Sequence, residues 1–265
     1  MRIDPQLCVG CSNCVAVCPM GAISIDPATG RAVISLDECV ECFACHRGMS
    51  TETLSPGLVR ALRGFLHLFR LRFDPEPDIC PTGAIVPDDL TWPRTVRRAF
   101  SDVRASHEDT GVQGRGTEEV KTNDVTGRIG PDDIGFVVEL GRPAIGARFR
   151  DIDRVTRSLA ESGVAFERDN PITGLLDDVE SGAIRADILD EKVMSAIVEF
   201  RVGLDEVPGV LDRLERVAEQ VDTVIAVGVA TRCDETGANR LEGVLDEAGY
   251  PALRAKTNIG LGRLT

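Results

Sequence analysis

The sequence has no long hydrophobic run. No stretch is both apolar enough and long enough to reach the roughly 20 residues that a membrane-spanning helix needs. We also expect no secretory leader, since Met1-Arg-Ile-Asp-Pro5 leads directly into the first cysteine-bearing loop. We therefore expect no transmembrane segment and a cytoplasmic location.

Positive charge is scarce as well. Lysine and arginine total 30 against 43 aspartates and glutamates, which gives a formal net charge of −13 at pH 7. Such a surface repels phosphate backbones, so we expect no nucleic-acid partner.

Sequence motifs for flavin, P-loop and radical-cofactor binding are absent too. Gly114 and Gly116 follow no predicted strand, and Gly260 and Gly262 open no predicted helix.

Length and composition are ordinary for a soluble globular protein. The 265 residues suffice for about two domains, each with its own core. Hydrophobic residues make up 43% of the chain and charged residues 28%.

Cysteine, in contrast, is abundant and regularly spaced. The first run has the spacing C-x2-C-x2-C-x3-C and consists of Cys8, Cys11, Cys14 and Cys18. A second run repeats the first three positions at Cys39, Cys42 and Cys45, and its fourth member, Cys80, arrives late. Each fourth cysteine begins a similar short segment, Cys18-Pro-Met-Gly-Ala-Ile23 or Cys80-Pro-Thr-Gly-Ala-Ile85. The sequence thus contains two copies of one half-unit, and residues 46–79 are an insertion in the second copy.

This pattern suits 4Fe-4S clusters, which need one thiolate for each iron. Residues 1–90 resemble the bacterial dicluster ferredoxins in both runs and in the Cys-Pro tails. The resemblance implies two 4Fe-4S clusters, with the fourth cysteine of each run binding the cluster of the other run. One cluster is expected on Cys8, Cys11, Cys14 and Cys80, and the other on Cys39, Cys42, Cys45 and Cys18. Zinc is the alternative, because C-x2-C pairs also build zinc sites.

Cluster cysteines also indicate the compartment. Thiolates that serve as ligands require a reducing, low-oxygen cytoplasm rather than a disulfide-forming environment. The ninth cysteine, Cys233, stands alone, as a bystander residue or a functional thiol.

The insertion over 46–79 predicts a helix from Pro56 to Phe73. Leu58, Leu62, Phe65 and Phe69 recur at helical spacing, and Ser55-Pro56 is a typical helix start. The insertion is basic in an acidic protein, with arginines that include Arg60, Arg63 and Arg70. Three roles are open: a helix packed on the rest of the protein, a docking site for a partner, or a membrane-surface helix.

The segment 91–133 is expected to be an ordered connection. It contains Trp92-Pro-Arg-Thr95 and a glycine-rich stretch that ends in Lys121-Thr-Asn-Asp-Val-Thr-Gly-Arg128. The C-terminus repeats the pattern K-T-N-x-x-x-G-R as Lys256-Thr-Asn-Ile-Gly-Leu-Gly-Arg263. Glycine lets backbone N–H groups approach an anion while lysine and arginine supply charge.

These loops are the candidate site for an anionic small-molecule ligand. Its predicted residues are Arg115, Lys121, Thr122, Asn123, Arg128, Lys256, Thr257, Asn258 and Arg263. The structural alternative is a pair of similar capping turns, in which asparagine and threonine satisfy backbone groups.

Residues 134–265 predict an α/β domain. Strands are expected at 134–140, 164–166, 196–202 and 223–230, and helices at 150–162, from 207 to 221 and around 241–245. This order predicts a ferredoxin-like sandwich with helices on one face of a sheet. Asp205-Glu-Val-Pro-Gly-Val-Leu211 resembles the start of an ACT domain, with one residue more than the usual D-x-P-G-x-L. The predicted fold class is therefore α+β: a dicluster ferredoxin domain with a helical insertion, then an ACT-like domain.

Two functions follow from these features. The first is an electron-transfer protein whose C-terminal domain docks a redox partner protein or senses a ligand, with a homodimer among the assemblies considered. The second is a reductase acting on a bound anion at the K-T-N loops, with His107 or Glu118 as acid–base group. The whole chain also resembles uncharacterised ferredoxin-fused proteins that share the text of residues 92–128, which implies that this region is ordered.

Overall fold

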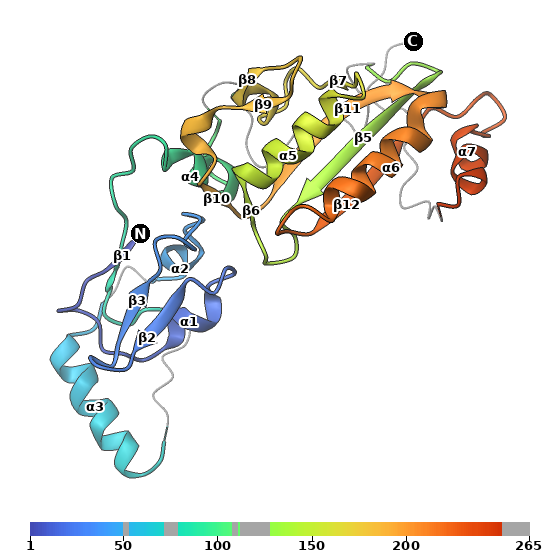
Figure 1. Ribbon diagram of the computed structural model, residues 1–265. Helices are drawn as coiled ribbons and strands as arrows, with labels where there is room; N and C mark the ends of the chain where they lie inside the picture. Colours follow the sequence, from blue (N-terminus) through green and yellow to red (C-terminus); the bar gives the residue numbers. More distant parts are fainter. Residues whose placement is uncertain (50–52, 72–78, 108–110, 112–127, 251–265) are drawn as a thin grey trace. The chain divides into compact units, whose positions relative to one another are not determined.

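The computed structural model describes residues 1–49, 53–71, 79–107, 111 and 128–250 (Figure 1). The chain divides into two compact units, Met1–Arg98 and Ala99–Thr265. The division falls within helix α4 (Thr95–Ser101), so the predicted connecting segment 91–133 spans both units. Each unit is described by itself.

The first unit is built from two short antiparallel ribbons. Strand β2 (Ile23–Asp26) pairs with β3 (Arg31–Ile34) in an antiparallel hairpin. Strand β1 (Arg2–Ile3) pairs with β4 (Ile85–Val86), which joins the start of the unit to the tail of the second cysteine run. Strands β2 and β4 begin at the same isoleucine of the repeated Cys-Pro-x-Gly-Ala-Ile text, so the two copies have the same local structure.

Two short helices carry the inner cysteines of the runs. Helix α1 (Asn13–Val17) contains Cys14, and helix α2 (Ala44–Arg47) contains Cys45. The core between the ribbons and these helices consists of small and medium apolar side chains together with cysteines: Met1, Cys8, Cys14, Ile23, Ala32, Phe43, Cys45, Ala84 and Ile85. The cysteines are therefore part of the hydrophobic core of this unit.

The hairpin turn between β2 and β3 fixes the position of the first cysteine loop. Asp26 accepts hydrogen bonds from the backbone N–H of Ala28 at 3.0 Å and from the hydroxyl of Thr29 at 2.7 Å, a typical turn for aspartate. A Cβ atom on Gly10 would lie 2.0 Å from the carbonyl oxygen of Gly30, and Gly10 has φ +66°. Only glycine fits at this approach of the cysteine loop to the turn.

Helix α3 (Pro56–Leu68) forms the described part of the insertion and is shorter than the helix predicted to Phe73. It ends where Arg70 adopts a left-handed conformation, with φ 59°. The face that packs inward carries Val59, which is 1% exposed. The predicted apolar row lies on the exposed side, as shown by exposed fractions of 41% to 62% at Leu58, Leu62, Phe65 and Phe69. Within the described residues, α3 therefore packs on its own unit through Val59 and not through this row.

The second unit contains a four-stranded antiparallel sheet of order β12-β5-β11-β7. Its strands are β5 (Asp133–Leu140), β7 (Ala165–Phe166), β11 (Ala196–Gly203) and β12 (Ile225–Ala230). Helix α5 (Phe149–Ala160) connects β5 to β7, and α6 (Val207–Ala218) connects β11 to β12. All four strands expected for this region are present, and so are its three expected helices, the third being α7 (Leu241–Glu247).

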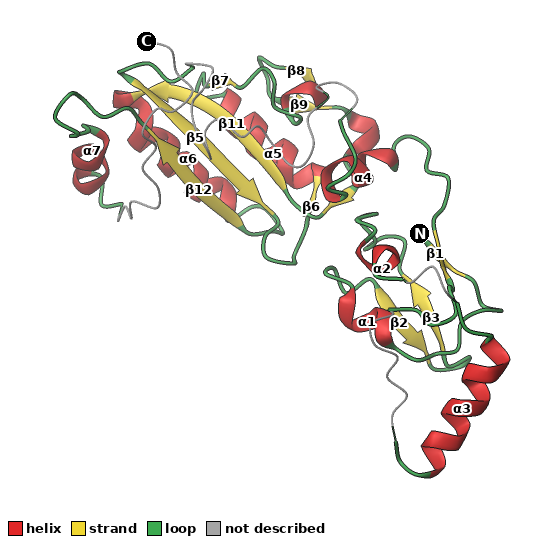
Figure 2. Cartoon of the chain, turned by 180° about the vertical axis from the view of Figure 1, so that it is seen from behind, coloured by secondary structure: helices red, strands yellow, loops and turns green. Residues whose placement is uncertain are grey.

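Helices α5 and α6 lie side by side on one face of this sheet (Figures 1 and 2). Their apolar positions recur at helical spacing, which explains why Ile152, Val155 and Leu159 of α5 are fully buried. Within the sheet, Phe136 and Phe200 are direct cross-strand partners and their rings stack with centroids 4.9 Å apart.

The link from β7 to β11 is longer than a hairpin and carries small elements of its own. Strand β8 (Leu176–Asp178) pairs with β9 (Ala183–Ile184), and β10 (Lys192–Val193) pairs with β6 (Ala147–Arg148). Helix α7 (Leu241–Glu247) follows β12. None of the helices within the described ranges is long and apolar enough to cross a bilayer.

Candidate metal centres

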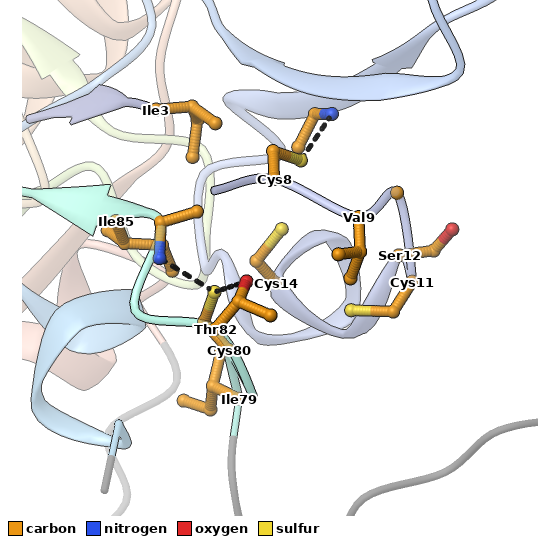
Figure 3. A pocket seen from close by; sticks show the side chains of 13 residues that line it. Ile3, Cys8, Val9, Cys11, Ser12, Cys14, Ile79, Cys80, Thr82 and Ile85 are labelled. Carbon is orange, nitrogen blue, oxygen red and sulfur yellow. Dashed lines mark hydrogen bonds between the residues drawn. The ribbon is translucent and has the colours of Figure 1, made fainter. Parts of the chain in front are cut away.

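The first candidate centre is a cavity lined by Cys8, Cys11, Cys14 and Cys80. About 300 Å³ there is free of protein atoms, a volume that includes space open to solvent. The four thiols come from the first cysteine run and from the tail of the second, and their side chains converge in Figure 3. Most of the remaining lining is apolar or small, including Ile3, Val9 and Ile85, so water has few partners there.

The second candidate centre has the complementary composition. Its cavity of about 350 Å³ is lined by Cys18, Cys39, Cys42 and Cys45. Met1, Ile23, Ile34 and Phe43 supply apolar walls. Each cavity thus gathers three cysteines of one run and the fourth cysteine of the other.

The thiol pKa values reflect the same grouping. Burial raises the pKa of Cys14 to about 12, and the charges that raise it further are those of Cys11, Cys80 and Cys8. Burial likewise raises the pKa of Cys45 to about 12, helped by Cys42, Cys39 and Cys18. A metal group that binds thiolates must displace the protons of such thiols.

Both cysteine loops share one backbone conformation. Ser12 and Phe43, which precede α1 and α2, have left-handed φ values of 71° and 62°. Gly10 and Glu41 occupy the previous x-positions of their runs and are also left-handed, at φ 66° and 54°. These turns point backbone N–H groups of each loop toward its centre, which is how a short loop solvates buried sulfur charge.

Backbone N–H groups donate hydrogen bonds to several sulfurs. The N–H of Ala22 reaches Cys18 Sγ at 3.3 Å, and the N–H of Ala84 reaches Cys80 Sγ at 3.1 Å. These are equivalent positions of the repeated tail, where Gly21 and Gly83 turn the chain with φ of 62° and 66°. The N–H of Ala32 in β3 donates to Cys8 Sγ at 3.3 Å. Donors aimed at sulfur stabilise the thiolate form that a metal requires.

Thr82 ties the late cysteine to the first loop. Its hydroxyl donates to the carbonyl of Leu7 at 2.7 Å, and the same oxygen lies 3.9 Å from Cys80 Sγ. The contact spans 75 positions of sequence, and it holds Cys80 in the first cavity despite the insertion.

The donor set fits a polynuclear iron–sulfur group. No group of three or more His, Cys, Asp or Glu side chains in the described ranges is placed to hold a single metal ion. Each cavity does gather four thiols, and a 4Fe-4S cluster takes four thiolates, one for each iron.

The predicted anion site falls largely outside the described residues. Arg115, Glu118 and Lys121 to Asn123 lie there, as do Lys256, Thr257, Asn258 and Arg263. Of the predicted set, Arg128 is described, and its guanidinium forms an ion pair with Glu167. Convergence of the two K-T-N loops therefore stays a prediction.

His107 and Cys233 are described. His107 is buried and packs edge-on against Phe100 with ring centroids 4.2 Å apart. Cys233 is exposed and forms no disulfide, as is true of all nine cysteines.

Comparison with known proteins concerns the first unit. Residues 1–47 match the family described as a 4Fe-4S dicluster domain. The chain is 48% identical over 46 residues to Ferredoxin-1 of Rhodobacter capsulatus, which covers 17% of this chain and 68% of that protein. It is 42% identical over 43 residues to the aliphatic sulfonate oxidoreductase, polyferredoxin-like subunit, of Pyrococcus furiosus, which covers 16% of this chain and 25% of that subunit. No solved structure matches the chain significantly.

Proposed function

Because the chain belongs to the ferredoxins with a 4Fe-4S dicluster domain through its N-terminal unit, we propose that it is an electron-transfer protein holding two 4Fe-4S clusters. The observation that carries the proposal is the sorting of eight cysteines into two cavities of four. Cys80 lies beyond the matched residues 1–47, so its place in the first cavity rests on the geometry of this chain.

A bound 4Fe-4S cluster would supply one-electron redox chemistry. The chain's own residues supply the conditions for this. The cysteine loops hold the thiolates, the apolar walls exclude water, and the N–H groups of Ala22, Ala32 and Ala84 offset sulfur charge. Protein dipoles that are already oriented need little rearrangement when the charge changes.

The redox partner is proposed to dock on helix α3. Arg60 and Arg63 of this helix donate to carbonyls of the first cysteine loop, so the helix is fixed close to the first cavity. Its outer row of Leu58, Leu62, Phe65 and Phe69 is exposed, and exposed apolar rows of this kind mark interaction sites. No acidic residue occurs from 53 to 72, while Arg60, Arg63, Arg70 and Arg72 do. An apolar patch with an acidic rim on the partner fits this surface.

A carboxylate-terminated electrode tests this docking surface as a substitute for an acidic partner. Phe65→Ser and Arg70→Glu should slow electron exchange with that electrode at low ionic strength, and the Arg70→Glu effect should shrink with added salt because screening removes long-range attraction. Val227→Ser, at an exposed apolar position in the other unit, is the matched control. Equal rates for Phe65→Ser, Arg70→Glu and the control would exclude the α3 surface.

For the second unit we propose partner docking or small-ligand sensing on a ferredoxin-like sandwich. The strand order β12-β5-β11-β7 with two crossover helices is that of a split β-α-β fold, which supports the ferredoxin-like interpretation. Asp205 to Leu211 lies between β11 and the body of α6, where the ACT resemblance expects it. A reductase acting on an anion at the K-T-N loops is the alternative. The ion pair of Arg128 with Glu167 counts against it, because that cation already has an anionic partner.

The deciding experiment is anaerobic purification followed by iron, sulfide and absorbance analysis. Two clusters require about eight irons and eight sulfides per chain. Four of each, or zinc, would refute the two-cluster proposal, and absorbance from a bound organic cofactor would favour the reductase. A reducing cytoplasm poor in oxygen is the proposed location, since thiolate-bound clusters persist there.

A further inference from the structure

A pair of arginines holds the backbone of the first cysteine loop. Arg60 donates to the carbonyl of Gln6 at 2.8 Å and to that of Cys8 at 3.3 Å. Arg63, one helical turn later in α3, donates to the carbonyl of Gly10 at 2.9 Å and also to that of Val9. The two guanidinium groups therefore cover the outer side of the loop that carries Cys8 and Cys11.

A second pair holds the second loop in the same way. Arg94 donates to the carbonyl of Leu36 at 3.0 Å and to that of Cys39 at 3.4 Å. Arg97 donates to the carbonyls of Asp37 at 2.8 Å and Cys39 at 2.9 Å. Arg97 is only 4% exposed, so water screens its charge little, and its bond to the carbonyl of Cys39 places that charge beside a residue that lines the second cavity.

The two pairs are equivalent in geometry but come from unrelated parts of the sequence. Both are spaced i, i+3, and both contact the carbonyl of the first cysteine of a run, Cys8 or Cys39. One pair lies in the insertion and the other follows Trp92-Pro93, so neither belongs to the duplicated half-unit. Two different segments thus supply the same kind of arginine pair, which indicates that both cysteine loops need a cationic contact.

Carbonyl contacts alone do not require a cation. Each carbonyl could be satisfied by water at this partly exposed edge, whereas a 4Fe-4S centre with four thiolates carries net negative charge. We propose that the pairs Arg60/Arg63 and Arg94/Arg97 are positioning residues that fix the two loops and raise the reduction potential of the cluster held by each loop. This inference rests on the proposed two-cluster function.

Glu41 allows a test of whether nearby charge shifts the reduction potential in the direction expected from its sign. Its side chain is fully buried beside the second loop, where its carboxylate accepts from Arg94 at 2.7 Å and from the amino group of Met1 at 2.7 Å. The charges of Glu41 and Arg94 both act on Cys39, in opposite directions. Arg47 adds a further cation there, 3.3 Å from the carbonyl of Cys42. If charge sets the potential, Glu41→Gln must shift the second cluster upward while loss of the arginines shifts it downward.

The experiment uses the full-length, cluster-loaded protein and an anaerobic redox titration followed by electron paramagnetic resonance. Arg60→Gln/Arg63→Gln should lower one of the two one-electron components by about tenfold in its reduction equilibrium constant, which is about 59 mV. Arg94→Gln/Arg97→Gln should lower the other component, and Glu41→Gln should raise that second one. Arg60→Lys/Arg63→Lys keeps the charge and should preserve the potential. Arg240→Gln, at an exposed arginine of the second unit, is the control.

Several results would overturn the inference. They are full iron content with unmoved potentials, a shift of the same component by both pairs, or a fall on Glu41→Gln. If a double variant does not retain its clusters, the single variants Arg60→Gln and Arg94→Gln apply the same criterion. Failure of the two-cluster proposal would be visible separately, as fewer than about eight irons in the unmodified protein.

Discussion

Crossed ligation is the sharpest prediction for the first unit, and Cys80→Ser tests it. The substitution removes one of the four thiols that line the first cavity and leaves the second cavity intact. It also removes the acceptor of the Ala84 N–H hydrogen bond. Since a 4Fe-4S cluster takes one thiolate per iron, the variant should fall from about eight irons to about four. Cys18→Ser, at the equivalent position of the other tail, should lose the same amount from the second cavity.

Single variants do not reveal which cluster was lost, but double variants do. Two cysteines of one cavity act on the same cluster, so Cys8→Ser/Cys80→Ser should retain about four irons, like either single variant. Cysteines of different cavities act independently, so Cys39→Ser/Cys80→Ser should retain almost none. Iron and sulfide analysis of anaerobically purified protein measures both. The reverse pattern would show that Cys80 belongs with Cys39, Cys42 and Cys45, and Cys233→Ser is the neutral control because that thiol is exposed.

Two further predictions concern a glycine and the core of the second unit. Gly10→Ala should selectively lose the first cluster, because its Cβ would lie 2.0 Å from the carbonyl oxygen of Gly30, whereas Gly21→Ala, also at positive φ but in open space, should retain about eight irons. Equal iron content in both would refute this steric argument. Ile152→Ala should lower the unfolding free energy of the second unit by about 2–5 kcal/mol, because the side chain is fully buried. Denaturant titration should show this shift, and the iron content should not change because all eight cavity cysteines lie in the first unit. A loss of iron would contradict this expectation.

The cysteine spacing was enough to predict the metal-ligand residues of the first unit. Short C-x2-C loops can converge on one centre without help from distant residues, so the ligand types could be predicted from the local sequence. Hydrophobic periodicity likewise predicted α5, α6 and the long strands β5 and β11, because apolar residues at helical or alternating spacing have few other ways to be buried.

Tertiary structure decided the roles of the arginines and of α3. Helical periodicity marks Leu58, Leu62 and Phe65 as one face, but it does not say whether that face packs, and here Val59 lies inward instead. Arg94 and Arg97 carry no local signal of their targets, because the carbonyls of Leu36 to Cys39 lie about 60 positions away in sequence. Guanidinium groups bind whichever carbonyls the fold brings within reach, and that is a property of the assembled chain.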